Sequence, residues 1–209
     1  MVECREISDV FAFPARNTRH DVGIGSHRVA REGCVIALHD AWNRFCRGIV
    51  LYSAYHSFVT RSGVVHRPAM GRNQRDALLH LKVNAASISS KSHGEPNWYI
   101  PAATIDAALL LQVPNSSTIS AAVGVSSLRS VVSPTAGVQA NSSPPAEIQS
   151  VRNYIAHRGS SAGKRIKPLK ATHGASNVLQ ILDAPVAGGL RLFDSWVSDL
   201  LDMADFATR

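Results

Sequence analysis

Apolar side chains recur at helical spacing over much of the chain, and the first such run is the longest. The stretch SHRVAREGCVIALHDAWNRFCRGIVLYSAYHSF, residues 26–58, has no proline and repeats apolar positions every three or four residues. This period predicts a long amphipathic helix, with Ser26 as its N-cap and the Gly- and Pro-containing RSGVVHRPAMG as its end. The apolar positions are Val35, Leu38, Trp42, Phe45, Cys46, Ile49 and Val50, and the predicted polar side holds His39, Asp40, Asn43, Arg44 and Arg47.

Four further stretches predict shorter helices. NQRDALLHLKVNAAS starts at Asn73, and PAATIDAALLLQV starts with Pro101, a residue favoured in the first helical turn. PPAEIQSVRNYIAH carries Ile148, Val151 and Ile155 on one stripe, with Gly159 as its stop. GLRLFDSWVSDLLDMADFA closes the chain with a broad apolar stripe and aspartates opposite it. The stripe consists of Leu190, Phe193, Trp196, Val197, Leu200, Leu201 and Met203.

The intervening segments lack a clear helical period. Residues 1–25 are expected to form an irregular arm, and SHGEPNWYIP, residues 92–101, a loop. The Ser- and Val-rich residues 115–132 fit either a helix or a strand. Residues 133–145 are rich in Pro, Gly and Ser, and the basic residues 158–176, RGSSAGKRIKPLKATHGAS, are rich in Gly, so both predict loops. The pattern therefore predicts an all-α fold, a bundle of about four to six helices with long irregular loops, in one domain over residues 26–209.

Composition adds a preference for polyanions. The 209 residues give a formal net charge of +7 and a pI near 9.8, and arginine supplies 17 of the 22 positive side chains. Guanidinium groups bind phosphate oxygens in a planar, bidentate way, which favours nucleic acid, although a solvated basic surface is the alternative. Three cysteines without a CxxC spacing suggest neither a disulfide framework nor a zinc site. With no signal-peptide pattern and no long apolar run, we expect a soluble, cytoplasmic protein that does not engage a membrane.

The most informative polar residues lie in the segment VRNYIAHRG. At about 100° per residue, His157 lies almost opposite the apolar stripe of its helix, and Asn153, four residues earlier, shares its face. The long side chain of Arg152 can reach toward the same helix end. An imidazole moves protons near neutral pH, a guanidinium holds phosphate charge, and an amide orients either group. The set suits phosphodiester cleavage without a metal, in which the 2′-hydroxyl of RNA is the nucleophile and a 2′,3′-cyclic phosphate is the product.

An arginine five residues before a histidine occurs three times, so the spacing alone is weak evidence. RSGVVH, from Arg61 to His66, contains Gly63 and is predicted to be a loop. RDALLH, from Arg75 to His80, is predicted to be helical, with Asp76 and His80 on one face, and is a rival site. Pairs at this spacing are also common on solvated helix faces, which is the structural alternative for RDALLH.

The sequence of the third match, VRNYIAHRG, resembles the signature of the HEPN superfamily. This signature has an arginine, a polar residue and then a histidine near the end of a late helix. In this chain these positions are Arg152, Asn153 and His157. The early helix ALHDAWNRFCRGIVLYSA is also similar to theirs, whereas residues 115–143 depart from a minimal HEPN bundle. The resemblance implies a metal-independent endoribonuclease, a nuclease acting on RNA as a homodimer with a shared active site. It also implies a place in antiviral defence or a toxin–antitoxin system, with an antitoxin or defence-system partner.

Basic residues after the motif extend the candidate site. Lys164, Arg165, Lys167 and Lys170, with Arg158, are predicted to hold an RNA backbone, and His173 is a further candidate; the structural alternative is a mobile basic loop. We expect no cofactor and no metal, since no carboxylate cluster or Walker-type loop is visible. Two alternatives stay open: a catalytically silent HEPN-like module for dimerisation, RNA binding or protein interaction, and a helical interaction protein unrelated to nucleic acid.

Overall fold

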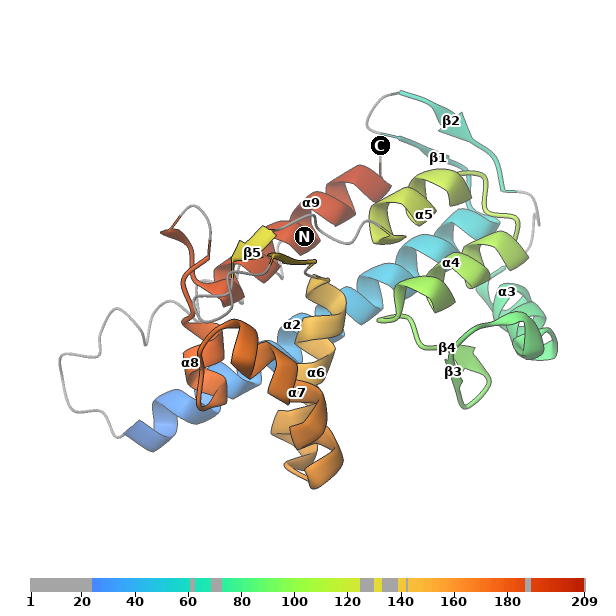
Figure 1. Cartoon of the computed structure of the whole chain (residues 1–209). Coiled ribbons are helices and arrows are strands. Elements are labelled where there is room, and N and C mark those ends of the chain that lie inside the picture. The colour runs from blue at the N-terminus through green and yellow to red at the C-terminus, as the bar shows by residue number, and fades with distance from the viewer. Residues whose placement is uncertain are drawn as a thin grey trace. The chain divides into compact units, whose positions relative to one another are not determined.

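The structure is a computed structural model that describes residues 24–60, 63–68, 73–124, 130–132, 139–141, 143–186 and 189–208. The predicted N-terminal arm lies outside these residues, apart from its last two. The described chain is mostly helical (Figure 1), as predicted, and it holds eight α-helices where about four to six were expected. The helices are α2 (Ile24–Tyr55), α3 (Gln74–Val83), α4 (Pro101–Leu110), α5 (Ser116–Gly124), α6 (Pro144–His157), α7 (Ser160–Thr172), α8 (Val178–Leu182) and α9 (Leu192–Ala207).

Short secondary elements fill several of the connections. A 3-10 turn, η1, spans Ala85–Ser87. Three two-stranded antiparallel sheets occur in the described part: β1 (Phe58–Val59) with β2 (Val65–His66), β3 (Lys91–Ser92) with β4 (Glu95–Pro96), and β5 (Ser130–Val132) with β6 (Gln139–Asn141). The ambiguous segment 115–132 thus contains both a helix, α5, and a strand, β5. The predicted loop 92–101 contains most of the β3–β4 hairpin, whose turn places His93 and Gly94 at positive φ.

The chain divides into two compact units. One comprises residues up to Ala41 together with Ser126–Leu201, and the other comprises Trp42–Val125 and Asp202–Arg209. The boundaries fall within α2 and α9, so each of these helices contributes to both units. The prediction of one domain over residues 26–209 stays a prediction.

The first unit has a core of helix faces. The first half of α2 buries Val35 and Leu38 completely, and α6 buries Ile148 and Val151. The most voluminous buried residues come from α9, where Phe193 and Trp196 are fully enclosed. Trp196 also donates its indole N–H to Glu147 Oε2 at 2.7 Å, which ties the start of α6 to α9. Burial of these apolar faces stabilises the unit that carries α6.

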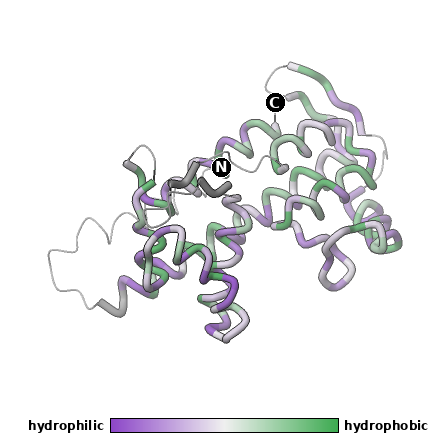
Figure 2. Tube along the Cα trace, in the orientation of Figure 1, coloured by the Kyte–Doolittle hydropathy of each residue, from purple (hydrophilic) through white to green (hydrophobic). Residues whose placement is uncertain are grey.

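The second unit is organised around the later part of α2. Its buried residues come from several helices, with Trp42, Cys46 and Val50 on α2, Leu81 on α3 and Ala107 on α4. Small residues on α4 and α5 let these two helices pack closely. Figure 2 shows apolar and polar segments alternating along the helices, as expected for elements with one buried face.

The largest difference between the predicted and the observed structure concerns residues 158–176. This segment was predicted to be a basic loop, but Ser160–Thr172 form a 13-residue helix, α7, with Pro168 inside it. Ala162, Ile166 and Leu169 recur at i, i+4 and i+7 and are buried, so packing of a narrow apolar stripe outweighs the helix-breaking residues. Ser26 is also not an N-cap, because α2 begins two residues earlier at Ile24.

Candidate functional site

The helix α6 places the motif residues on its partly exposed side. Pro144 and Pro145 occupy the first turn, where the missing N–H costs nothing. Ile148 and Val151 are buried as predicted, and Ile155 is half-buried. The helix ends at His157, and Arg158 adopts the left-handed conformation with φ of 44°. The predicted stop residue, Gly159, instead forms the N-cap of α7, so only two residues separate the helices.

The structure brings two of the three predicted catalytic residues into direct contact. Arg152 Nη1 donates to Asn153 Oδ1 at 3.2 Å, and both side chains are half-buried. Asn153 and His157 lie one helical turn apart on the same face, and His157 is exposed at the end of the helix. Asn153 therefore contacts the guanidinium of Arg152 and shares a helix face with His157. The Nε atom of Arg152 is buried and has no hydrogen-bond partner within the described chain.

A histidine on α2 belongs to the same neighbourhood and was missed. His39 was predicted to lie on a solvated face, but it is buried, with 7% of its surface exposed, and its Nδ1 lies 3.2 Å from Asp40 Oδ1. Burial is the main cause that lowers the His39 pKa, the nearby charge of Arg152 lowers it further, and Asp40 opposes both. Arg152 is therefore near enough to His39 for its charge to act on the imidazole. Helical spacing correctly predicts that Asp40 is exposed, but it places His39 on the polar side, whereas the structure buries this residue.

A buried carboxylate holds the end of α6 against α2. Glu32 is 7% exposed, and its Oε2 accepts a hydrogen bond of 2.7 Å from Arg158 Nη2. Its Oε1 accepts one of 2.8 Å from Arg28 Nε, and this pairing raises the Arg28 pKa. Arg31, directly before Glu32, pairs with Asp183, the C-cap of α8. Arg158 was predicted to bind RNA. In the structure, its ion pair with Glu32 links the end of α6 to α2.

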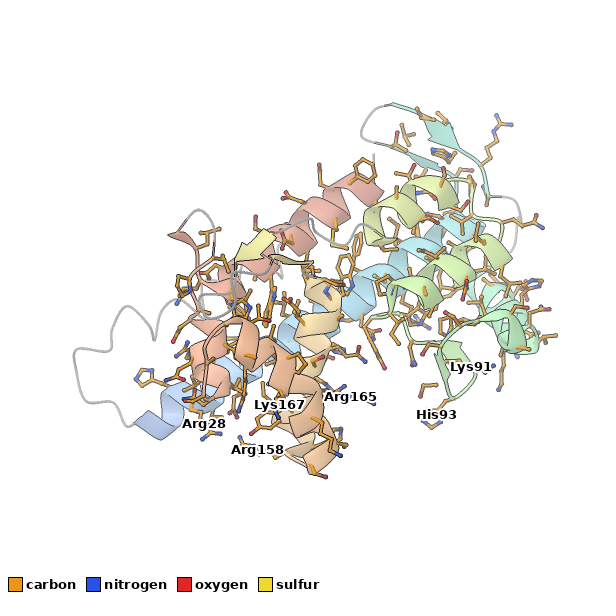
Figure 3. The ribbon with its side chains drawn as sticks, in the orientation of Figure 1. Arg28, Lys91, His93, Arg158, Arg165 and Lys167 are labelled. Atoms are coloured by element: carbon orange, nitrogen blue, oxygen red, sulfur yellow. The ribbon has the colours of Figure 1, made fainter. Side chains whose placement is uncertain are left out.

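The helix α7 presents the other predicted RNA-binding residues. Lys164, Arg165 and Lys167 are exposed and lie outside its buried stripe. Lys170 is half-buried: its ammonium donates to Ser176 O at 2.9 Å and lies 5.5 Å from the Tyr154 ring centroid. The labelled side chains of Arg158, Arg165 and Lys167 project from the α6–α7 pair in Figure 3. Three of the four α7 cations are thus available to a ligand, and the fourth contacts its own unit.

The remaining candidates are less well supported. His173 is half-buried at the C-cap of α7, and burial lowers its pKa. In the rival motif, Asn73 caps α3 by accepting from the Asp76 backbone N–H at 3.1 Å, and Arg75 lines a shallow depression with Asn73, Gln74 and Leu78. His80 is not among the residues that line this depression. Of the arginine and the histidine in the rival motif, this depression is thus lined by the arginine.

The described residues include no group of three or more His, Cys, Asp or Glu side chains that could hold a metal ion. Cys34 and Cys46 are buried free thiols, and burial raises the pKa of both. Among the described helices, none combines the length and the apolar character needed to cross a membrane. A scan against protein-family models and searches of curated proteins and of solved structures found no match to this chain.

Proposed function

We propose that this chain is a metal-independent endoribonuclease of the HEPN type, with Arg152, Asn153 and His157 as its catalytic residues. The observation that carries the proposal is the arrangement on α6: Arg152 is hydrogen-bonded to Asn153, and Asn153 shares a helix face with the exposed His157. A proton-transfer group, an amide and a phosphate-binding cation are thus arranged along one helix.

The proposed reaction needs no group beyond these side chains and the RNA. His157 accepts the proton of the 2′-hydroxyl as that oxygen attacks phosphorus, or donates a proton to the leaving 5′-oxygen as the P–O bond breaks. Arg152 neutralises the charge that develops on the phosphate oxygens, and Asn153 orients the guanidinium. The products are a 2′,3′-cyclic phosphate and a 5′-hydroxyl. The second proton transfer is assigned to the same histidine of a second copy in a homodimer.

Positive charge next to the motif supports RNA as the substrate. Lys164, Arg165 and Lys167 are exposed on the helix that follows His157 after two residues, and α7 itself carries no acidic residue. Such cations bind a phosphate backbone without reading its sequence. The role in antiviral defence or a toxin–antitoxin system, with a partner protein that controls cleavage, belongs to the same proposal.

The test compares purified wild type with His157→Ala and His80→Ala on mixed cellular RNA in the presence of EDTA. The expected result is cleavage by wild type and by His80→Ala, cyclic phosphate ends on the fragments, and a loss of at least about 100-fold in rate for His157→Ala. Because His157 is exposed, its replacement leaves the core intact, which circular dichroism checks. Equal cleavage by all three proteins would exclude this site, and cleavage lost only in His80→Ala would favour the rival motif.

A further inference from the structure

A cluster of aromatic and imidazole rings lies on the surface of the second unit. It is distant in sequence from the proposed catalytic residues. Tyr52 and Tyr55 lie on the last turn of α2, and His56 follows directly after its end, so the three residues are at i, i+3 and i+4. The ring centroids of Tyr52 and His56 are 4.6 Å apart, as are those of Tyr55 and His56. Tyr52 is 49% exposed and His56 is also exposed. The rings thus touch one another, with Tyr52 and His56 open to solvent and Tyr55 half-buried.

A second ring pair follows on the adjoining hairpin. Phe58 on β1 and His66 on β2 are register partners, and their rings are stacked with centroids 5.0 Å apart and planes at 23°. Arg67, directly after β2, is exposed. The hairpin leaves the end of α2 after only two residues (Figure 1), so the two ring groups belong to one continuous segment of the chain.

These rings are not part of the core. On the same turns of α2, Leu51, Ser53 and Ala54 are buried and form the inward side. Tyr52 and His56 occupy the outward side, where a globular domain commonly carries charged residues. One turn before Tyr52, Gly48 is exposed, and no described atom lies within 4 Å of a Cβ placed there. Flat rings next to an open position offer faces on which another flat ring can lie.

The charge of this segment identifies the kind of ligand. From Ala41 to Arg75 the sequence has no Asp or Glu and has six Arg, and it includes His56 and His66. Within this segment, Arg47 is paired with a carboxylate, and its Nε lies 3.4 Å from Glu95 Oε2. Exposed rings within a cationic, acid-free segment are complementary to a ligand with flat bases and a phosphate backbone. Bases in a duplex are already stacked, so only unpaired bases have free faces.

We propose that the surface formed by Tyr52, Tyr55, His56, Phe58 and His66, with Arg67 at its edge, binds unpaired bases of single-stranded RNA by stacking. The surface deepens the proposed function by assigning single-stranded RNA as the substrate class. It also stands independently of cleavage, because base stacking requires none of the catalytic residues.

The test measures binding of a fluorescent single-stranded RNA 12-mer of mixed sequence and of the same strand in a duplex, by anisotropy. All proteins carry His157→Ala so that the RNA stays intact. Tyr52→Ala with His56→Ala should weaken single-strand binding by about tenfold or more, with little change for the duplex, because stacking on a ring contributes strongly per base. Tyr52→Phe keeps the ring and should stay within about twofold, as should Leu79→Ala, an exposed residue on α3 in the same unit.

Unchanged single-strand affinity in the double variant would overturn the assignment, and so would equal losses for single strand and duplex. Circular dichroism melting of each variant separates loss of the rings from loss of the fold. Absence of any RNA binding by the parent also overturns it, and points to a protein ligand for this surface. Tight, ring-dependent binding by a chain that never cleaves RNA would support the surface while rejecting the proposed ribonuclease.

Discussion

At the scale of single residues, the polar groups around α6 differ in what holds them. Arg152 is oriented by Asn153, Arg158 is paired with a buried carboxylate, and His39 is enclosed beside Asp40. His157, in contrast, is exposed at the end of its helix. Buried charged and polar groups need partners, whereas a group that must meet a substrate needs access. Local surroundings therefore separate residues with a structural role from the candidate for proton transfer.

The burial of His39 predicts a specific loss of stability in acid. Its folded pKa lies below the unfolded value near 6.5, so the unfolded chain binds more protons between these two values. The free energy of unfolding should be fully retained above pH 6.5 and should fall as the pH decreases from there toward the folded pKa. His39→Gln should show a smaller decrease between about pH 7.5 and 5 in urea unfolding.

Substitutions at two neighbours of His39 should change this acid-dependent loss of stability in opposite directions. Asp40→Asn removes the group that raises the His39 pKa, so the acid-dependent loss should become larger. Arg152→Met removes a positive charge that lowers this pKa, so the loss should become smaller. If the free energy of unfolding depends on pH in the same way in His39→Gln, Asp40→Asn and Arg152→Met, then His39 does not titrate in contact with these residues.

The buried carboxylate of Glu32 predicts a stability effect of its own. Glu32→Gln keeps the size of the side chain but removes the charge that two arginines share, and we expect a loss of about 1–2 kcal/mol in the free energy of unfolding. Glu95→Gln is the matched control, because Glu95 is 44% exposed and its pair with Arg47 is longer, at 3.4 Å. The control should change stability by less than about 0.5 kcal/mol. Equal effects in urea titrations would contradict a special role for Glu32.

At the scale of elements, the helices with a strong apolar period were predictable and α7 was not. α2, α3, α4, α6 and α9 begin and end close to the predicted positions, because capping residues and apolar stripes act locally. α7 has Gly163 and Pro168 within it and few apolar residues, so its propensity is low. Ile166 and Leu169 of α7 are buried, so packing of these side chains stabilises a helix whose intrinsic propensity is low. As a helix, α7 holds its exposed cations at fixed spacing.

This arrangement predicts how RNA binding depends on salt. In a His157→Ala background, replacing Lys164, Arg165 and Lys167 together by Gln should reduce the slope of log affinity against log salt concentration by about 2, because each phosphate contact to a single strand contributes about 0.7. Lys170→Gln should change the slope little, since its ammonium is held by Ser176 and Tyr154. Anisotropy titrations over a series of salt concentrations give both slopes. An unchanged slope in the triple variant would exclude α7 as the backbone contact.

At the scale of the whole molecule, the two compact units carry different chemistry. The unit with α6 and α7 holds the candidate catalytic residues, and the unit with the later part of α2 holds the ring surface. Both units use segments distant in sequence, since each draws on α2 and α9. Separating the units by cutting the chain would therefore divide two helices, so experiments need the full chain.

The proposed homodimer predicts how activity responds to mixing. If one active site needs His157 from both copies, then replacing half of the wild type by His157→Ala at constant total protein should leave about one quarter of the activity, because only wild-type pairs act. Independent sites would leave about one half. The measurement is the cleavage rate after the two proteins have exchanged subunits, across a series of ratios. A linear response would reject a shared site.

The sequence by itself determined the all-α class, five helices and the off-core face of His157, because helical periodicity and capping depend on near neighbours in the chain. Only the tertiary structure decided the helical state of α7, the burial of His39, the pairing of Arg158 with Glu32 and the stacking of Phe58 on His66. Each of these depends on groups that are distant in sequence or on a packed neighbour. Burial and electrostatic pairing depend on what lies across a contact, which a one-dimensional pattern does not contain.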